Sequence, residues 1–365
     1  MKIGYLCSSN SWGGLEMNHL RNAVWMKERS HEVVILCVEN SPLHLKAIQE
    51  KLPIILINRH RKYYDFKAGK HLAKVISKEN ISHLMIRDNR DVSVSAIAKR
   101  YAKNPTFHLS YFMEMQLGVK KTNLLHTLRF RKIDLWSCPL NWLQSQVESM
   151  TKMDMSKTVV IPSGLNLSHF QKELSLSEAR TLLDLPIDKT ILGMIGRFDP
   201  AKGQLLLLKA LKELKDKDVC ICLLGEPTRN EGLGYSEQIE RFIRENDLSH
   251  RVFIRPFRDD IITFYKAINA FVMASKAETF GMVTIEAMAS GTPTIGSNAG
   301  GTPEILGQGK FGYLFETLNV KSLTDTIESF LKSDPISKEA LLQEVQKYDH
   351  QRVCSAIENA IGLKS

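Results

Sequence analysis

Short apolar runs alternate with helical patterns along most of the chain, and no other feature of the sequence limits the fold as strongly. In the first half, the runs that indicate strands are residues 2–7, 32–38, 54–57, 83–86, 135–138 and 158–161. In the second half they are residues 191–195, 219–224, 252–255, 270–274 and 294–296. Strands of this length separated by helices are typical of parallel, doubly wound sheets. The sequence therefore predicts an α/β protein with two Rossmann-like domains.

A polar stretch that starts at Pro162 and extends to about residue 177 separates the two series of strands. The chain has 365 residues, enough for two α/β domains of ordinary size. We expect the first domain over residues 1–165 and the second over residues 178–344. Ligands of such sheets bind outside the carboxyl ends of the strands, so we expect the functional loops there, facing a cleft.

The positive charge is concentrated in the first half. Residues 1–165 contain 25 lysines and arginines and 13 aspartates and glutamates, a net charge of +12, whereas residues 166–365 carry −3. A basic face attracts phosphates, anionic lipid or nucleic acid. The sequence contains no recognised nucleic-acid-binding module, so we expect no nucleic-acid partner. The first domain is therefore expected to meet another kind of anionic molecule or surface.

A loop and a helix that follow the strand at residues 270–274 carry the clearest chemical signal. Glu278 and Gly281 stand in the loop, a helix is expected to begin near Met282, and Glu286 lies about one turn inside it. The first turn of a helix presents free backbone N–H groups and the positive end of the helix dipole, which suits a diphosphate. Both glutamates can accept hydrogen bonds from sugar hydroxyls. The pattern indicates a site for a diphosphate that carries a sugar.

The segment from Ala277 to Glu304 closely resembles the signature of glycosyltransferase family 4. In that family two glutamates are separated by seven residues and a small-Gly-x-Pro turn follows. A Gly-Gly-x-x-Glu segment comes next, as in the stretch from Gly300 to Glu304 here. The resemblance implies a GT-B fold, a nucleotide-sugar donor and retention of configuration. It also implies that the last helical stretch, about residues 345–365, packs back on the first domain.

The resemblance assigns roles to residues of this segment. Glu278 is expected to contact the donor sugar and to act in catalysis, and Glu286 is expected to bind the ribose. The backbone amides of Gly281, Met282 and Val283 are expected to contact the sugar and the phosphates.

A second motif runs from Gly196 to Gly203 and follows the first strand of the second half. It contains Arg197 and Lys202, and such a pair at the end of a strand can neutralise a diphosphate. The resembling family uses its Gly-Arg…Lys-Gly pair for this purpose. Because the charge on the diphosphate develops as the glycosidic bond breaks, both residues are expected to act in catalysis. With two cations available, we expect no metal cofactor.

Two features of the first half match the same family. Gly13 and Gly14 lie between a strand and a helix, where the family's loop approaches the donor phosphates, so their amides are expected to bind the donor. His108 is expected at the end of a short apolar run, where the family places a histidine near the donor sugar. A lone histidine is more often a structural residue, but with the family resemblance both interpretations stay open. Glu114 and Gln116 follow, and we expect them near the acceptor.

A basic stretch between Val119 and Trp136 interleaves leucines with lysines and arginines. As a helix it would lie on an anionic membrane, and an ordinary basic surface helix fits equally well. No apolar segment approaches the ~20 residues needed to span a bilayer, and the first residues do not resemble a secretion signal. The sequence therefore predicts a cytoplasmic protein, with peripheral contact to the inner face of the membrane left open. Asp216 and Asp218 form an Asp-x-Asp sequence, which binds a divalent metal in some transferases of another fold. Here it stands at the end of a charged helical segment, so we expect both aspartates to be solvated.

Together these features predict a retaining glycosyltransferase that moves a hexose or N-acetylhexosamine from a nucleotide-diphosphate sugar to a glycan or lipid-linked acceptor. Synthesis of bacterial surface polysaccharide or lipopolysaccharide suits the basic first domain. The leaving phosphate is expected to help deprotonate the acceptor, so no covalent nucleophile is needed. Two alternatives stay open: a sugar-nucleotide epimerase of similar architecture, and a non-catalytic scaffold that binds nucleotide sugars. UDP-sugars and GDP-sugars are both candidate donors.

Overall fold

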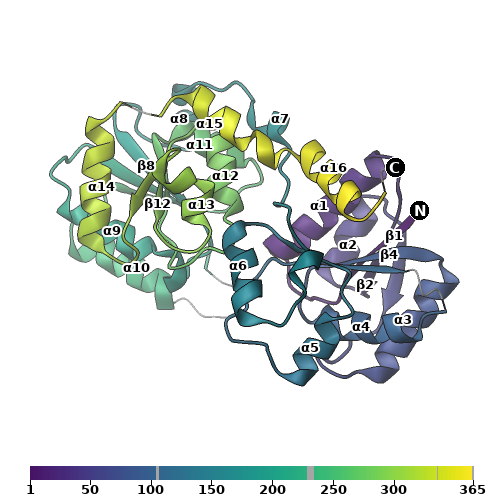
Figure 1. Cartoon of the computed structure of the whole chain (residues 1–365). Helices are drawn as coiled ribbons and strands as arrows, with labels where there is room; N and C mark the ends of the chain where they lie inside the picture. Colours follow the sequence, from purple (N-terminus) through teal and green to yellow (C-terminus); the bar gives the residue numbers. More distant parts are fainter. Residues whose placement is uncertain (104–106, 228–233, 335, 364–365) are drawn as a thin grey trace. The chain divides into compact units, whose positions relative to one another are not determined.

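The structure is a computed structural model, and the chain divides into two compact units (Figure 1). One unit consists of residues 1–164 with 348–365, and the other of residues 165–347. Each contains one parallel sheet with helices on both faces, which confirms the predicted fold class of doubly wound α/β domains. The residues that the structure describes are 1–103, 107–227, 234–334 and 336–363.

The first unit is built on a seven-stranded sheet in the order β3-β2-β1-β4-β5-β6-β7. A parallel sheet that is covered on both faces must be apolar along the whole of each strand, which is why its strands could be recognised as short runs of Val, Ile and Leu. The predicted bounds of β1, β2, β3 and β6 agree with the structure. The strands are β1 (Lys2–Cys7), β2 (Glu32–Val38), β3 (Ile54–Ile57), β4 (Ile81–Ile86), β5 (His108–Phe112), β6 (Leu135–Cys138) and β7 (Thr158–Val160).

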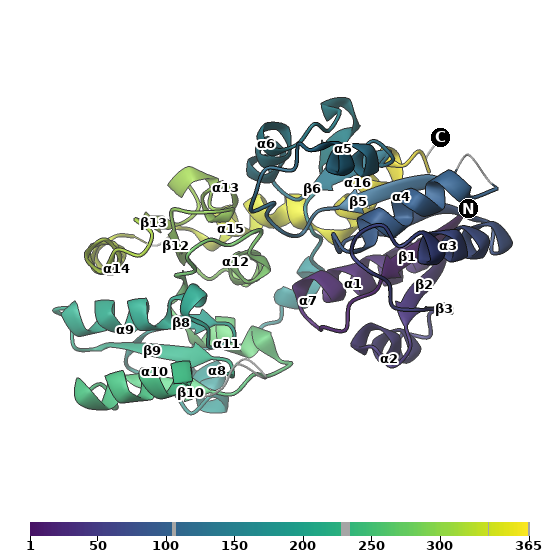
Figure 2. The ribbon, with the colours of Figure 1, turned by 90° about the horizontal axis from the view of Figure 1, so that it is seen from below.

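Helices cover both faces of this sheet through two separate core clusters. One face packs against α3 (Phe66–Lys78), α4 (Asp91–Tyr101), α5 (Leu124–Phe130) and α6 (Asn141–Met150). The other face packs against α1 (Gly14–Glu28), α2 (Pro42–Gln49) and α16 (His350–Ala360). Figure 2 shows α3 and α4 side by side on their face of the sheet.

The helix α16 joins the first unit although it ends the chain. Glu358 on α16 is buried, and it accepts hydrogen bonds from Arg29 Nη2 at 2.7 Å and from His31 Nε2 at 2.9 Å. Val353 and Ile357 complete the contact by packing into the core cluster shared with α1. The helix begins at His350 after a 3₁₀ turn, five residues later than the sequence indicates, and residues 364 and 365 lie outside the described part of the chain.

The second unit is built on a six-stranded sheet in the order β10-β9-β8-β11-β12-β13. Its last strand has only three residues, too few for a recognisable pattern, and the sequence analysis did not anticipate it. The strands are β8 (Thr190–Ile195), β9 (Val219–Leu224), β10 (Val252–Arg255), β11 (Ala270–Met273), β12 (Thr294–Ser297) and β13 (Tyr313–Phe315).

Helices again cover both faces of the second sheet. One face packs against α9 (Gln204–Glu213), α10 (Gly234–Glu245) and α14 (Val320–Lys332). On the other face, Phe264 and Ile268 at α11 (Ile261–Ala267) lie over Gly193 of β8. The remaining helices of this unit are α7 (Leu167–Phe170), α8 (Leu176–Leu182), α12 (Met282–Ala289), α13 (Thr302–Ile305) and α15 (Lys338–Glu344).

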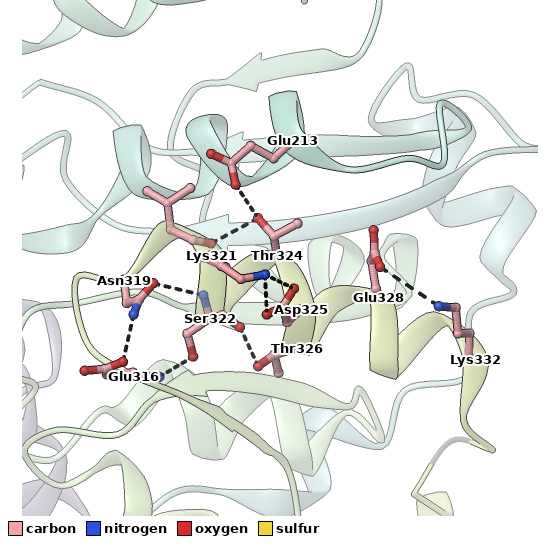
Figure 3. Close-up of polar contacts among 11 residues, drawn as sticks. Glu213, Glu316, Asn319, Lys321, Ser322, Thr324, Asp325, Thr326, Glu328 and Lys332 are labelled. Carbon is pink, nitrogen blue, oxygen red and sulfur yellow. Dashed lines mark hydrogen bonds and ion pairs between the residues drawn. The ribbon is translucent and has the colours of Figure 1, made fainter.

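Polar residues at the start of α14 form hydrogen bonds with the loop that follows β13 (Figure 3). Asn319 caps the helix by accepting the amide of Ser322 at 3.0 Å, and its own side-chain amide donates to Glu316 at 2.7 Å. The amide of Glu316 in turn donates to Ser322 Oγ at 2.9 Å. Further along the helix, Lys321 pairs with Asp325. The contacts of Asn319, Glu316 and Ser322 satisfy groups at the helix end, whereas the Lys321–Asp325 pair joins exposed side chains one turn apart.

The basic stretch between Val119 and Trp136 is only partly helical in the structure. Only Leu124–Phe130 is helical, and the chain re-enters the sheet as β6 at Leu135. Asn123 starts α5 by accepting the amide of His126 at 2.9 Å. The helical part of the stretch is therefore short, and its last residues belong to β6, as predicted for residues 135–138. Within the described ranges, no helix is both long and apolar enough to cross a membrane.

Candidate active site

The carboxyl edge of the second sheet brings together two charged residues that are far apart in the sequence. Lys202 ends a 3₁₀ turn after β8, and Glu278 stands in the loop after β11, the strand next to β8. Lys202 Nζ lies 2.9 Å from Glu278 Oε2, and both side chains are partly exposed. The structure therefore places these two predicted site residues in contact, at the edge where parallel sheets bind their ligands.

The start of α12 lies directly after this loop. Gly281 is the N-cap residue, and its φ of +83° is a left-handed conformation that favours glycine. Because glycine has no side chain, Gly281 cannot accept hydrogen bonds from the amides of Met282 and Val283 in the first turn of the helix. Their position agrees with the expectation that a helix begins at Met282 and presents its amides beside Glu278.

A glycine pair fixes the loop that carries Glu278. The carbonyl oxygen of Glu278 accepts the amide of Gly301 at 2.8 Å. A Cβ atom on Gly300 would lie 2.2 Å from that same oxygen, so any other residue would force the two loops apart. The Gly-Gly segment that marked the sequence resemblance thus holds the Glu278 loop against the loop after β12.

Glu286 on α12 is held by a residue that the sequence analysis did not identify. The hydroxyl of Tyr265, on α11, lies 3.0 Å from Glu286 Oε2 and 3.1 Å from the carbonyl oxygen of Val283. Burial, followed by the charge of Glu286, raises the pKa of Tyr265 well above its usual range, so the phenol stays protonated and donates. No sequence signal marks Tyr265, because the contact depends on how α11 and α12 pack.

Arg197 follows β8 in an exposed loop. Its carbonyl oxygen accepts a hydrogen bond from Gln204 Nε2 at 2.9 Å, which ties the loop to the start of α9. Within the part of the chain that the structure describes, the Arg197 guanidinium makes no ion pair with an acidic side chain, so it can still bind an anion.

The two glycines between β1 and α1, Gly13 and Gly14, differ in how accessible they are to a ligand. Gly13 is the N-cap residue of α1, and its amide donates to the carboxylate of Glu16 at 2.9 Å. A phosphate would have to displace this buried carboxylate to reach the Gly13 amide. Gly14 is exposed, and a Cβ atom there would meet nothing within 4 Å.

The structure corrects the position of His108. β5 begins at His108 and ends at Phe112, so the histidine lies at the amino end of the strand instead of the end of an apolar run. Its ring lies 5.5 Å from the ring of His83, and its Nδ1 is 3.2 Å from Ser110 Oγ. Burial, aided by His83 and Lys99, lowers the pKa of His108 to about 4. The geometry favours the structural interpretation of this residue, because ligands bind at the opposite edge.

Glu114 follows β5 at the carboxyl edge, where acceptor contact was expected for it. Instead it forms an ion pair with Arg87, and both side chains are only 8% exposed. Asn18 Nδ2 donates to it at 3.2 Å and Ser163 Oγ at 2.9 Å. Through these three contacts, Glu114 connects the end of β4, the helix α1 and the last residues before the second unit. A carboxylate that already has three partners in its own unit gives no support to the expected contact with the acceptor.

The two aspartates of the Asp-x-Asp sequence, Asp216 and Asp218, make contacts that have nothing to do with a metal ion. Asp218 pairs with Lys189 at 2.6 Å, and Asp216 Oδ1 accepts the amide of Asp218 at 2.8 Å. Both aspartates are exposed. Across the described ranges, no group of three His, Cys, Asp or Glu side chains is arranged to hold a metal ion.

Comparison with known proteins finds a family match in the second half of the chain. Residues 178–348 match the family model described as glycosyl transferases group 1. The D-inositol 3-phosphate glycosyltransferase of Mycolicibacterium smegmatis is 31% identical over 192 residues, which is 52% of this chain and 43% of that protein. The match thus spans less than half the length of that relative. The phosphatidyl-myo-inositol mannosyltransferase of Mycobacterium leprae is 28% identical over 381 residues, covering 98% of this chain and 95% of that one.

Solved structures match the whole chain. The Anabaena protein HepE in complex with UDP has a TM-score of 0.88 at 21% identity and covers 100% of both chains. The lipopolysaccharide outer core galactosyltransferase WaaB has a TM-score of 0.76 at 15% identity, again over 100% of both chains. At these identities the likeness establishes the fold. Residues 178–348 therefore match the glycosyl transferases group 1 family, and the chain has the GT-B fold.

Proposed function

We propose that the protein is a retaining glycosyltransferase that takes its sugar from a nucleotide-diphosphate sugar bound to the second unit. The observation that carries the proposal is the Lys202–Glu278 ion pair beside the uncapped start of α12. It combines a cation for the diphosphate, a carboxylate for sugar hydroxyls and backbone amides for the phosphates.

Donor binding would rearrange this ion pair. Lys202 would turn toward the diphosphate, leaving Glu278 to accept hydrogen bonds from the sugar. Arg197 would add a second positive charge, so the two cations would offset the diphosphate without a metal. Glu286, oriented by Tyr265, would accept from the ribose hydroxyls. Of the glycine pair in the first unit, Gly14 is the better candidate for a phosphate contact, because the amide of Gly13 is already bonded.

Transfer would proceed on one face of the sugar. The bond between the anomeric carbon and the diphosphate oxygen breaks while the acceptor hydroxyl oxygen attacks from the same side. The hydroxyl proton passes to the leaving phosphate oxygen. Negative charge grows on the diphosphate in the transition state, and this is the charge that Arg197 and Lys202 would stabilise.

The names of similar proteins support a more specific assignment. HepE has been solved in complex with UDP-glucose, which favours a UDP-hexose donor. The relatives are named for transfer to inositol phosphate or phosphatidyl-myo-inositol, and WaaB for transfer to lipopolysaccharide. We therefore propose a hexose or N-acetylhexosamine as the transferred sugar. The proposed acceptor is a glycan or lipid-linked molecule of surface polysaccharide or lipopolysaccharide synthesis.

A surface of the first unit suggests peripheral contact with the cytoplasmic face of a membrane. The Leu124 patch, as we name it, consists of the exposed residues Leu124, Leu125, Leu128, Tyr63 and Tyr64. In the sequence, exposed lysines and arginines stand within four residues of these side chains, at positions 61, 62, 120, 131 and 132. Exposed leucines and tyrosines with positive charge close by in the sequence suit an anionic lipid surface.

Vesicle co-sedimentation tests the membrane contact. The wild type should sediment with phosphatidylcholine vesicles that contain phosphatidylglycerol, and the double variant Leu124→Ser/Leu128→Ser should sediment less. The double variant Leu45→Ser/Ile48→Ser is the matched control, because both residues are exposed on α2, on the other face of the sheet. No sedimentation of the wild type at low salt would exclude the contact.

The transferase assignment is tested with a panel of UDP- and GDP-sugars and of glycan and lipid-linked acceptors. The wild type should transfer a sugar with retention, and Glu278→Ala and Lys202→Ala should each lose at least about a hundredfold in kcat/KM. Efficient epimerisation of a donor without any acceptor would favour the epimerase instead. Tight donor binding without turnover across the panel would favour the scaffold.

A further inference from the structure

The first unit contains a cavity of about 310 Å³ at the carboxyl edge of its own sheet. Leu6 of β1 and Ile57 of β3 line it near the ends of their strands. Arg59 and His60, which follow β3, and Lys67 of α3 also line it. The volume lies at the lower end of the range of about 300–1,000 Å³ that is usual for small-molecule sites.

Two cationic side chains of this cavity lack acidic partners. Arg59 and Lys67 are exposed, and neither makes an ion pair with an acidic side chain in the portion of the molecule that the structure describes. The acidic residue of the lining, Asp65, is engaged in capping α3, where it accepts the amides of Ala68 at 3.0 Å and Arg61 at 3.2 Å. The cavity therefore presents unpaired positive charge.

A buried polar network holds the loop after β3 in place. His60 Nε2 lies 2.9 Å from Asp91 Oδ1, and the two side chains are 2% and 0% exposed. The other ring nitrogen of His60 lies 3.0 Å from the carbonyl oxygen of Arg61. Ser8 Oγ donates to Asp91 at 2.6 Å and links the network to the end of β1.

This network also removes a negative charge from beside the cavity. Both ring nitrogens of His60 face oxygen acceptors, so the geometry requires a protonated imidazolium. Burial opposes the charge, but the hydrogen bond with Asp91 and its attraction outweigh burial and raise the pKa of His60. The pair His60–Asp91 is then neutral overall, and Asp91 does not repel an anion bound in front of it.

We infer that this cavity binds a phosphate group carried by the acceptor. Two unpaired cations suit the double charge of a phosphate monoester better than the single charge of a carboxylate. That the phosphate belongs to the acceptor rests on the proposed transferase function, because the donor is assigned to the second unit. The binding of phosphate itself does not depend on that assignment.

Calorimetric titration with inorganic phosphate tests the inference. All titrations contain saturating UDP, so that the donor site of the second unit is occupied. Wild type should bind phosphate at low ionic strength, and Arg59→Gln and Lys67→Gln should each bind about tenfold more weakly, the effect of losing one hydrogen bond to a charged group. Lys74→Gln is the matched control, because Lys74 is also exposed on α3 but does not line the cavity. Equal phosphate affinity in wild type, Arg59→Gln and Lys67→Gln, or equal weakening in Lys74→Gln, would overturn the inference.

Competition identifies the source of the phosphate. Glucose 6-phosphate, compared with glucose, represents a soluble phosphorylated acceptor. Phosphatidylinositol phosphate in phosphatidylcholine vesicles, compared with the same vesicles without it, represents a lipid headgroup. Displacement of inorganic phosphate by either probe supports the assignment, and displacement by neither overturns it.

The experiments distinguish a failure of the transferase proposal from a failure of the phosphate-binding inference. If wild type transfers no sugar but Arg59→Gln still weakens phosphate binding, the transferase proposal fails and the phosphate cavity stands. If transfer occurs and both Arg59→Gln and Lys67→Gln leave the acceptor KM unchanged, the cavity is not the acceptor site.

Discussion

Replacing Tyr265 with phenylalanine tests whether the buried tyrosine positions Glu286 for the donor. The substitution removes only the hydroxyl, which lies 3.0 Å from Glu286 Oε2, and leaves a ring that is 1% exposed. A hydrogen bond to a charged group is worth about 2 kcal/mol. The second unit should therefore lose about that much unfolding free energy, which corresponds to a fall in its Tm of about 4–8 °C.

The same change should weaken donor binding. A carboxylate that has lost its hydrogen-bond donor can rotate away from the ribose, so we expect the donor KM to rise about tenfold. Because the ribose contact is the same in the ground state and the transition state, kcat should change little. Steady-state kinetics with varied donor at saturating acceptor separates the two constants.

A matched control and a clear negative result complete the experiment. Tyr313→Phe also removes one tyrosine hydroxyl from the second unit, but that hydroxyl meets Ser333 Oγ at 2.9 Å in an exposed, uncharged contact. Tyr313→Phe should leave Tm and donor KM nearly unchanged. If Tyr265→Phe lowers Tm as expected but leaves the donor KM at the wild-type value, Tyr265 stabilises the fold and does not position Glu286 for the donor.

Three further changes have expected outcomes. Lys202→Gln should lower kcat by a factor of about 10²–10³ in a transfer assay, because the lost cation faces charge that grows in the transition state, and a change in donor KM alone would contradict this role. Arg29→Ala should cost about 3 kcal/mol in urea unfolding, because it leaves the buried carboxylate of Glu358 without its main cation, and a loss below about 1 kcal/mol would show that α16 is held by apolar packing instead. The pKa of His60 is raised in the folded state, so its pairing with Asp91 stabilises fully below the unfolded value of 6.5 and is lost as pH rises through the folded value. As the pH rises above about 6.5, the wild type should therefore lose more stability than His60→Gln, and parallel curves would refute the charged pair.

The positions of most strands and of the donor-side motifs were set by the sequence. Strands covered on both faces must be apolar along their whole length, so runs such as Glu32–Val38 stand out against the amphipathic helices between them. The loop around Glu278 could be recognised because its backbone turns sharply into a helix at a glycine, and Gly281 adopts a positive φ there. These features depend on neighbours in the chain, which is why one sequence is enough to find them.

Contacts between distant residues were decided only by the tertiary structure. Lys202 meets Glu278 because β8 and β11 are neighbours in the sheet, and no local pattern specifies that order. His108 was misplaced because an apolar run does not show which end of it begins the strand. The phosphate cavity, which unites β1, β3 and α3, was not anticipated for the same reason. Sequence patterns record the burial and backbone needs of each segment, whereas the partners of a side chain depend on how separate segments pack.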